Sequence, residues 1–169
     1  LRSLRRRLEE ASLRLDDVQA LILSHGHSDH VAGATALTNE LGVPVFMNQG
    51  TRDEVPELRE LGRWECFAAG QPFSVGNLQI HPFEVSHDAA QPVGFRFSSE
   101  GVSGTAITDL GELSPPVIRH LRGCDWLILE SNHDEEMLKL GSYPWFLKQR
   151  LLGRQGHLSN QELSRFLAE

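Results

Sequence analysis

The segment His25-Gly26-His27-Ser28-Asp29-His30 gathers three histidines and one aspartate within six residues. Imidazole nitrogens and carboxylate oxygens are protein atoms that bind zinc, manganese and iron. In an extended loop, alternate side chains point the same way, so His25 and His27 can reach one metal ion. Asp29 and His30 can then reach a second position nearby. The segment therefore predicts a site for two divalent metal ions, either Zn2+ or Mn2+.

A simpler interpretation of the same segment is a polar helix N-terminus, in which Asp29 caps the helix and the histidines are solvated. We favour metal binding because further metal-binding side chains stand where strands or loops are expected to end. These candidates are His87, Asp109 and His157. Each one alone is more typical of an ordinary surface or buried residue, and only their combination with the histidine-rich segment favours ligation.

The elements that must position these residues alternate along the chain. The histidine-rich segment follows a short apolar run at 18–24, which is typical of a buried strand that ends in a loop. A helical pattern covers 31–41 and ends at Gly42, and a second apolar strand follows at 43–48. This alternation indicates an α/β fold. Further helices are expected at 1–15, 49–61, 114–122, 134–140, 144–152 and from about 160, and further strands at 78–86, 92–99, 102–109 and 124–131.

Two local signals support this assignment. Glu100-Gly101 lies between two expected strands and predicts a hairpin turn. Ser159 and Glu162 have the spacing of a capping box that begins the last helix. No repeat, low-complexity tract or linker divides the sequence, so we expect one domain over residues 1–169.

The composition excludes several classes of protein. It is that of an ordinary globular protein, with 40% hydrophobic and 23% charged residues. No apolar run approaches the ~20 residues of a membrane span. The separated Cys66 and Cys124 suit a reducing compartment, so we expect a cytoplasmic protein without a membrane or an obligate protein partner. The net charge of −7 argues against nucleic-acid binding by bulk positive charge, but not against a locally positive site.

The order of these motifs resembles the metallo-β-lactamase superfamily of dinuclear hydrolases, in which H-x-H-x-D-H follows a buried strand and a distant His, Asp and His follow in that order. Finer details are similar to its YycJ-like branch, also called WalJ. They are SHGHSDH (24–30), VSHDAAQPVGFRF (85–97), TDLG (108–111), LESNHD (129–134) and PWFLKQRLLGRQGHLSN (144–160). The resemblance runs from about residue 16 to the end of the chain. It implies an αβ/βα sandwich of two mixed sheets flanked by helices.

The resemblance also implies how the ligands are shared. His25, His27 and His87 would hold the first metal ion. Asp29, His30 and His157 would hold the second. Asp109 would bridge the two ions together with a water or hydroxide. Family members begin with two or more strands before the helix at 1–15 and continue beyond the last helix, so we expect an incomplete domain that lacks N-terminal strands and a last segment.

A site of this kind predicts a metal-dependent hydrolase that acts on phosphodiesters. Two divalent cations, two aspartates and a hydroxide carry a net charge of about +1, which stabilises the charge that develops at phosphorus. Asp29 would orient the hydroxide and accept its proton. The branch is associated with 5′-to-3′ exonuclease activity on DNA, so the resemblance implies that activity here. Hydrolysis of a thioester, a lactone or another small ester stays open, as does a non-catalytic metal-binding or partner-binding module.

Other histidines need separate interpretations. His133 follows the strand at 124–131 and is a candidate general acid or phosphate ligand. A structural histidine that bonds to a backbone carbonyl is an equal alternative for His133. His81 lies within a strand and His120 within a helix, so we assign both to packing or to the surface.

The stretch 139–158 is locally basic, although the whole chain is acidic. It carries four basic residues and no acidic one: Lys139, Lys148, Arg150 and Arg154. Lys148 and Arg150 are therefore candidate contacts to a nucleic-acid backbone, with a solvated helix face as the alternative. The same stretch carries three aromatic residues: Tyr143, Trp145 and Phe146. These could stack on a base, but their helical spacing favours core packing.

Overall fold

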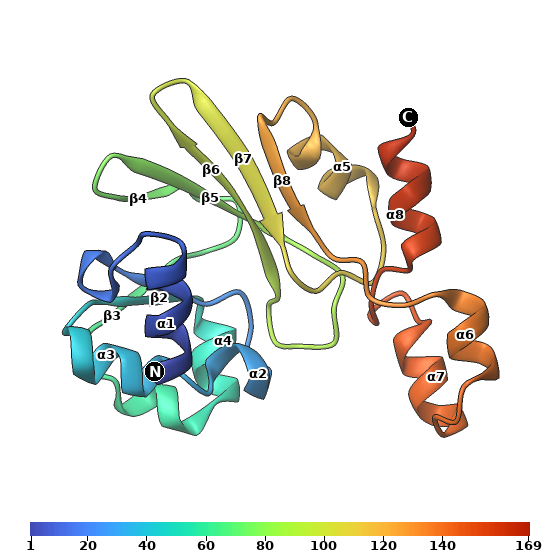
Figure 1. Cartoon of the computed structure of the whole chain (residues 1–169), viewed down its shortest axis with the longest axis horizontal. Coiled ribbons are helices and arrows are strands. Elements are labelled where there is room, and N and C mark those ends of the chain that lie inside the picture. The colour runs from blue at the N-terminus through green and yellow to red at the C-terminus, as the bar shows by residue number, and fades with distance from the viewer. The chain divides into compact units, whose positions relative to one another are not determined.

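In the computed structural model, which describes all 169 residues, the chain forms two compact units. Unit 1 comprises residues 1–71 and 89–91, and unit 2 comprises residues 72–88 and 92–169. Each unit contains one sheet and several helices (Figure 1). None of the helices combines the length and the apolar character that a membrane crossing requires.

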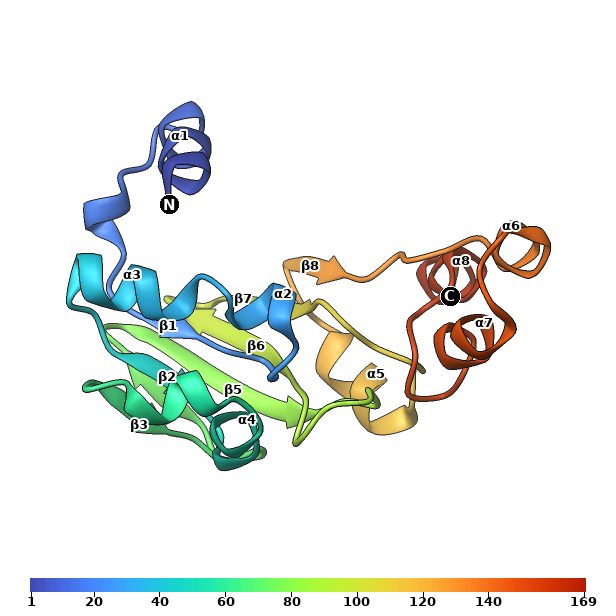
Figure 2. The ribbon, with the colours of Figure 1, turned by 90° about the horizontal axis from the view of Figure 1, so that it is seen from below.

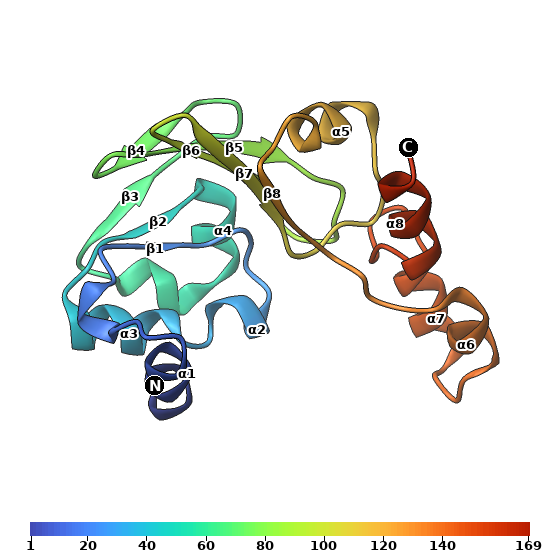
Figure 3. The ribbon, with the colours of Figure 1, turned by 45° about the horizontal axis from the view of Figure 1, so that its top comes forward.

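The sheet of unit 1 is wholly parallel and has the order β1-β2-β3 (Figure 3). Its strands are β1 (Leu21–Ile22), β2 (Val45–Met47) and β3 (Trp64–Cys66). Parallel neighbours need crossover connections, which are helical here. The helical elements of unit 1 are α1 (Arg2–Glu10), η1 (Leu15–Asp17), α2 (Ser28–Val31), α3 (Ala34–Leu41), α4 (Gln49–Glu54) and η2 (Pro56–Glu60).

The core of unit 1 gathers apolar side chains from the strands and the crossovers. Leu23, Val45 and Met47 pack with Leu58 and Leu61 of the segment before β3. The single helix expected at 49–61 is divided in two, because the residue before a proline avoids the helical conformation. The break falls at Val55, directly before Pro56, where φ is −114° and ψ is 102°.

The sheet of unit 2 is mixed and has the order β4-β5-β6-β7-β8. The strands from β4 to β7 pair antiparallel, and β8 pairs parallel to β7. They span β4 (Phe73–Val75), β5 (Leu78–Glu84), β6 (Val93–Ser99), β7 (Val102–Ile107) and β8 (Trp126–Leu129). The hairpin expected at Glu100-Gly101 is confirmed, with φ of 51° and 85° at the two residues, as a tight hairpin turn requires.

The helices of unit 2 are α5 (Pro115–Leu121), α6 (Glu135–Leu140), α7 (Trp145–Leu151) and α8 (Asn160–Leu167) (Figure 2). Helix α5 packs on the sheet, where Val117 and Leu121 contact Phe83 and Ile107. The capping box that begins α8 is confirmed, since the Ser159 side chain accepts the amide of Glu162 at 3.1 Å.

Strand β8 is more exposed than its sequence predicts. The apolar run at 124–131 predicts a buried strand, but Trp126, Leu127 and Ile128 are exposed. Because β8 is the last strand of its sheet, its side chains on both faces have neighbours from an adjacent strand on one side only. Sequence patterns also missed β3 and β4, which are only three residues long each.

Candidate metal centre

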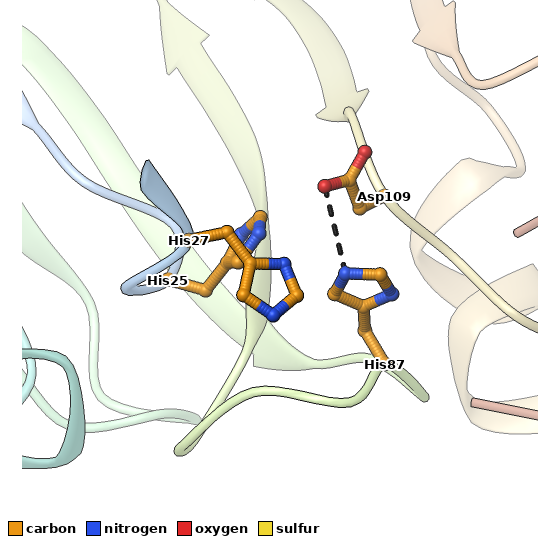
Figure 4. A group of neighbouring side chains, drawn as sticks. All are labelled: His25, His27, His87 and Asp109. Atoms are coloured by element: carbon orange, nitrogen blue, oxygen red, sulfur yellow. Dashed lines mark ion pairs between the residues drawn. The ribbon is translucent and has the colours of Figure 1, made fainter. Parts of the chain in front are cut away.

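The histidine-rich segment of unit 1 leaves β1 as a loop and enters α2 (Figure 4 shows His25 and His27 on this loop). His25 is buried, and its ring centroid lies 4.7 Å from that of His27 and 4.1 Å from that of His30. The Nδ1 atom of His25 is 3.0 Å from the hydroxyl of Ser24. Three imidazole rings this close form the kind of donor set that a divalent cation takes.

The alternative of a capped helix with solvated histidines does not describe this loop. The N-cap residue of α2 is His27, and no side chain caps the helix. Asp29 instead lies in the first turn with its side chain 78% exposed, and its Oδ2 is 3.5 Å from Nε2 of His30.

In unit 2, His87 follows β5 and is buried. Its Nδ1 donates to the carbonyl oxygen of Gly156 at 2.9 Å, because a carbonyl oxygen can only accept. Nε2 lies 3.6 Å from Oδ2 of Asp109 (dashed line in Figure 4). An imidazole nitrogen and a carboxylate oxygen at this separation can bind one cation together. A hydrogen bond at one ring nitrogen is also how proteins orient metal-binding histidines.

His157 lies in the loop between α7 and α8 and shows the same kind of orientation. Its Nδ1 is 2.6 Å from Oε1 of Glu130 and 3.9 Å from Oδ1 of Asp109. The hydrogen bond to Glu130 raises the pKa of His157, because it stabilises the imidazolium form. One ligand atom each of Asp109, Glu130 and His157 lies within 4.8 Å of the other two.

Glu130 is a functional candidate that the sequence patterns did not single out. It is buried at the end of β8, and its Oε2 accepts the amides of Leu110 at 2.8 Å and Leu158 at 3.1 Å. Its Oε1 accepts from Nδ2 of Asn132 at 3.2 Å in addition to His157. A carboxylate with four donors is positioned to orient His157 rather than to bind a metal itself. Its signal in the sequence is an acidic residue directly after an apolar strand.

Backbone contacts hold the ligand-bearing loops of unit 2 together. A Cβ atom on Gly111 would lie 2.1 Å from the carbonyl oxygen of Arg154, so only glycine permits this approach. The hydroxyl of Ser86 donates to the same carbonyl at 2.7 Å, and the amide of Gly111 donates to the carbonyl of Ser86 at 2.6 Å. These loops carry His87, Asp109 and His157.

His133 lies in a pocket of about 340 Å³ in unit 2 that also contains His157 and Arg154. Its Nδ1 is 3.3 Å from Oδ1 of Asn132, and its Nε2 is buried without a hydrogen-bond partner. The side chain therefore does not bond to a backbone carbonyl, which was the structural alternative. Burial lowers the pKa of His133, so the ring is neutral at neutral pH.

The structure corrects the expectation that Lys148 contacts a phosphate. Lys148 is buried, and its ammonium donates to the carbonyls of Lys139 and Gly141, both at 2.7 Å. It therefore ties α7 to the C-terminus of α6. Arg150 is half-exposed and pairs with Asp88 at 2.5 and 3.1 Å, which raises the pKa of Arg150.

The other cations of this stretch are also paired, since Lys139 bonds to Glu135 at 3.3 Å and Arg154 bonds to Glu112 at 2.8 and 2.9 Å. A second correction concerns the three aromatic residues expected in the core: Tyr143, Trp145 and Phe146 are all exposed. They lie in the α6–α7 connection and the first turn of α7.

The remaining histidines pack as expected. The ring of His120 stacks on that of Phe83, with centroids 4.1 Å apart and planes 5° apart. The ring of His81 meets His120 edge-on at 5.3 Å. Both belong to the interface of β5 and α5 and not to the metal ligands.

A family model described as a beta-lactamase superfamily domain matches residues 1–169. The chain belongs to this superfamily. It is similar to the exodeoxyribonuclease YycJ of Bacillus anthracis, with 32% identity over 166 residues, which are 95% of this chain and 62% of that protein. It is also similar to the exodeoxyribonuclease WalJ of Streptococcus pneumoniae, with 34% identity over 160 residues, which are 92% of this chain and 60% of that protein. The expected resemblance to the YycJ-like branch is thereby confirmed.

Solved structures support the same fold. The metallo-β-lactamase fold protein YhfI of Bacillus subtilis superimposes with a TM-score of 0.68 at 19% identity, over 94% of this chain and 62% of that chain. The short form of human tRNase Z gives a TM-score of 0.67 at 16% identity, over 96% of this chain and 72% of that one. The metallo-β-lactamase fold is therefore confirmed. This member of the superfamily spans only 62% and 60% of the lengths of the two exodeoxyribonucleases.

Proposed function

We propose that the chain carries the dinuclear metal centre of a DNA exonuclease that degrades its substrate in the 5′-to-3′ direction. Family membership and the two exodeoxyribonuclease relatives support this activity. The observation that carries the proposal is the pair of oriented imidazoles in unit 2. His87 and His157 each bond through Nδ1 to a protein acceptor, and each lies within 4 Å of a carboxylate oxygen of Asp109.

The proposed ligands follow the family pattern. His25, His27 and His87 hold one ion, Asp29, His30 and His157 hold the other, and Asp109 bridges them. All donor atoms are imidazole nitrogens or carboxylate oxygens, which suit both Zn2+ and Mn2+. Two such ions would supply a nucleophilic water with a pKa near ~7 and positive charge for a phosphodiester.

Two residues of the chain handle protons in this proposal. The exposed carboxylate of Asp29 orients the attacking water and accepts its proton. The Nδ1 of His133 carries the proton and faces Asn132. Its Nε2 has no hydrogen-bond partner and can accept a proton in the pocket that also contains His157. An approaching phosphodiester raises the pKa of this ring by its negative charge, so Nε2 takes up a proton that it can deliver to the leaving oxygen.

Arg150 is the proposed contact to the DNA backbone. Asp88, which follows His87 in the sequence, accepts two hydrogen bonds from the guanidinium of Arg150. About half of the Arg150 side chain stays exposed. Lys148 is not part of this contact, because its ammonium serves the backbone of α6. The two free cysteines agree with the proposed cytoplasmic location.

The test measures bound metal by elemental analysis and cleavage with end-labelled, 5′-phosphorylated duplex DNA, using a glutathione thioester as the competing substrate. We expect ordered release of nucleotides from the 5′ end, and loss of this activity on chelation. Asp109→Ala should lower the bound metal from two ions toward one or none. Turnover of the thioester without DNA cleavage would support a small-ester hydrolase instead. Metal binding without turnover of either substrate would support a binding module.

Retention of two ions by Asp109→Ala would show that the bridging assignment is wrong even if DNA is cleaved. The metal measurement and the cleavage assay therefore test the ligand set and the substrate separately.

A further inference from the structure

Helices α6 and α7 carry an apolar surface that nothing in unit 2 covers. Five large side chains within ten residues are exposed: Met137 (75%), Leu140 (87%), Tyr143 (57%), Trp145 (66%) and Phe146 (73%). We call these five residues the α6–α7 surface. Single exposed apolar side chains are normal in proteins, but a group of this size marks an interaction site.

The backbone beneath this surface is held in place. The buried ammonium of Lys148 bonds to the carbonyls of Lys139 and Gly141, which joins the start of the connection to α7. The amide of Gly141 also bonds to the carbonyl of Met137 at 2.8 Å. Figures 2 and 3 show the two helices as a pair joined by a short loop. A preformed surface loses little conformational entropy when a partner binds.

The local charge of α6 and α7 distinguishes between two possible partners, a single nucleic-acid strand and a second copy of the chain. Residues 134–152 hold three acidic side chains (Asp134, Glu135 and Glu136) and three basic ones (Lys139, Lys148 and Arg150). Lys148 is buried, so the other five sum to −1 in a chain of −7. A single nucleic-acid strand needs a positively charged groove beside its stacking residues, and the cations here already bond to protein acceptors. A second copy of the acidic chain meets little repulsion where the local net charge is small.

We propose that the α6–α7 surface is a homodimer interface, in which a second copy applies the same surface across a two-fold axis. At their exposed fractions, the five residues present roughly 700 Å² of accessible surface, most of it apolar, against the ~800 Å² per partner of a standard stable interface. Aromatic residues and methionine are the types enriched at the centres of such interfaces. The dimer is independent of the activity proposed above.

The test is the molar mass of the purified protein by light scattering from about 1 to 100 μM, which covers the weak end of the affinities known for interfaces of this size. We expect a dimer that dissociates on dilution. Trp145→Ala should raise its dissociation constant at least ~30-fold, as loss of a central aromatic residue does. The matched control is Ile128→Ser, which removes an exposed apolar side chain of β8 outside the surface and should leave the dimer intact.

A wild-type protein that stays monomeric over the whole range overturns the proposal, and so does a dimer that only Ile128→Ser disrupts. Oxidative footprinting gives a second readout that does not require a variant to fold. Labelling of Met137, Tyr143 and Trp145 should fall as the protein concentration rises. Protection that needs added single-stranded DNA, in a protein that remains monomeric, would assign the surface to base stacking and overturn the dimer.

Discussion

One buried carboxylate, that of Glu130 in the loop after β8, connects this loop to two others of unit 2 that are distant in sequence. It accepts the amide of Leu110 after β7 and, from the loop before α8, the amide of Leu158 and Nδ1 of His157. Burial of a charge is costly unless hydrogen bonds compensate it, and here every acceptor position is used. The ring orientation of His157 therefore depends on a residue outside the ligand set.

The first prediction concerns this carboxylate. Glu130→Gln should weaken metal binding about 10- to 100-fold, because an amide group cannot accept from two backbone amides and His157 together. Competition with a chromophoric chelator measures the affinity. Glu112→Gln is the control, since it removes a carboxylate that pairs only with Arg154. Equal affinities of the two variants would contradict the orienting role.

The second prediction concerns His133. His133→Ala should leave the bound metal unchanged and slow DNA cleavage about 10²- to 10⁴-fold, the usual contribution of a proton-transferring side chain. Elemental analysis and single-turnover cleavage measure the two effects. Unchanged turnover would make His133 a structural residue whose unbonded Nε2 has no part in the reaction.

Residue type and spacing predicted the histidine-rich loop and the family, because metal ligands must be of a few chemical kinds. They did not predict the roles of Glu130 and Lys148, whose partners are backbone groups. A buried lysine that binds carbonyls and a surface lysine that binds phosphate look identical in sequence. Only the fold decides which of them Lys148 is.

Helix α7 is joined to the end of α6 by Lys148, whose ammonium donates to the carbonyls of Lys139 and Gly141. Lys148→Met keeps the apolar stem but leaves the carbonyls of Lys139 and Gly141 without this donor. We expect a loss of about 1–3 kcal/mol in the free energy of unfolding. Urea denaturation measures this loss.

Arg150→Ala should affect DNA binding and not stability, the reverse of Lys148→Met. It should change stability little, since its ion pair with Asp88 is half-exposed, and should reduce the salt dependence of DNA binding by about one charge. Lys148→Met should leave that salt dependence unaltered. Binding isotherms at several salt concentrations measure the slopes, and a reversed pattern would restore Lys148 as the DNA contact.

The contact between α5 and β5 predicts a pH effect on folding. Burial lowers the pKa of His120, with nearby His81, Arg96 and Arg119 adding to the shift. The unfolded chain takes up this proton near pH ~6.5, whereas the folded chain stays neutral to lower pH. The stability from a neutral His120 is therefore present above pH ~6.5 and is lost as the pH falls toward the folded-state pKa.

Denaturation midpoints of the wild type and of His120→Gln between pH ~5 and ~8 measure this effect. The variant should lose less stability on acidification. Parallel pH profiles of the two proteins would show that His120 does not contribute.

Periodicity predicted most elements, and its failures have local causes. The helix expected at 49–61 breaks at Val55 because Pro56 follows it. The strands β3 and β4 are too short to show a pattern of alternation. The exposure of Tyr143, Trp145 and Phe146 was missed because helical spacing describes an apolar face but not what covers it.

The proposed ligands belong to both compact units. His25, His27, Asp29 and His30 belong to unit 1, and His87, Asp109 and His157 belong to unit 2. Sequence patterns, which showed no linker, could not reveal this division, because unit 1 takes in residues 89–91 from the middle of unit 2.

The last prediction follows from that distribution. Zn2+ or Mn2+ at about 100 times its dissociation constant should stabilise the fold by ~2.7 kcal/mol. It should also slow amide hydrogen exchange in the loops of both units that carry ligands. Mass spectrometry with and without chelator measures the exchange, and Asp109→Ala is the control. Protection confined to one unit would contradict the shared ligand set.

The open edge of β8 has a consequence for handling the protein. Three residues of β8, Trp126, Leu127 and Ile128, combine exposed apolar side chains with an edge that no strand pairs. Such an edge is a template on which strands of other molecules can be added, the first step toward fibrils. Natural edge strands often carry a charged residue that opposes such pairing. Ile128→Lys would place one on an exposed position of β8.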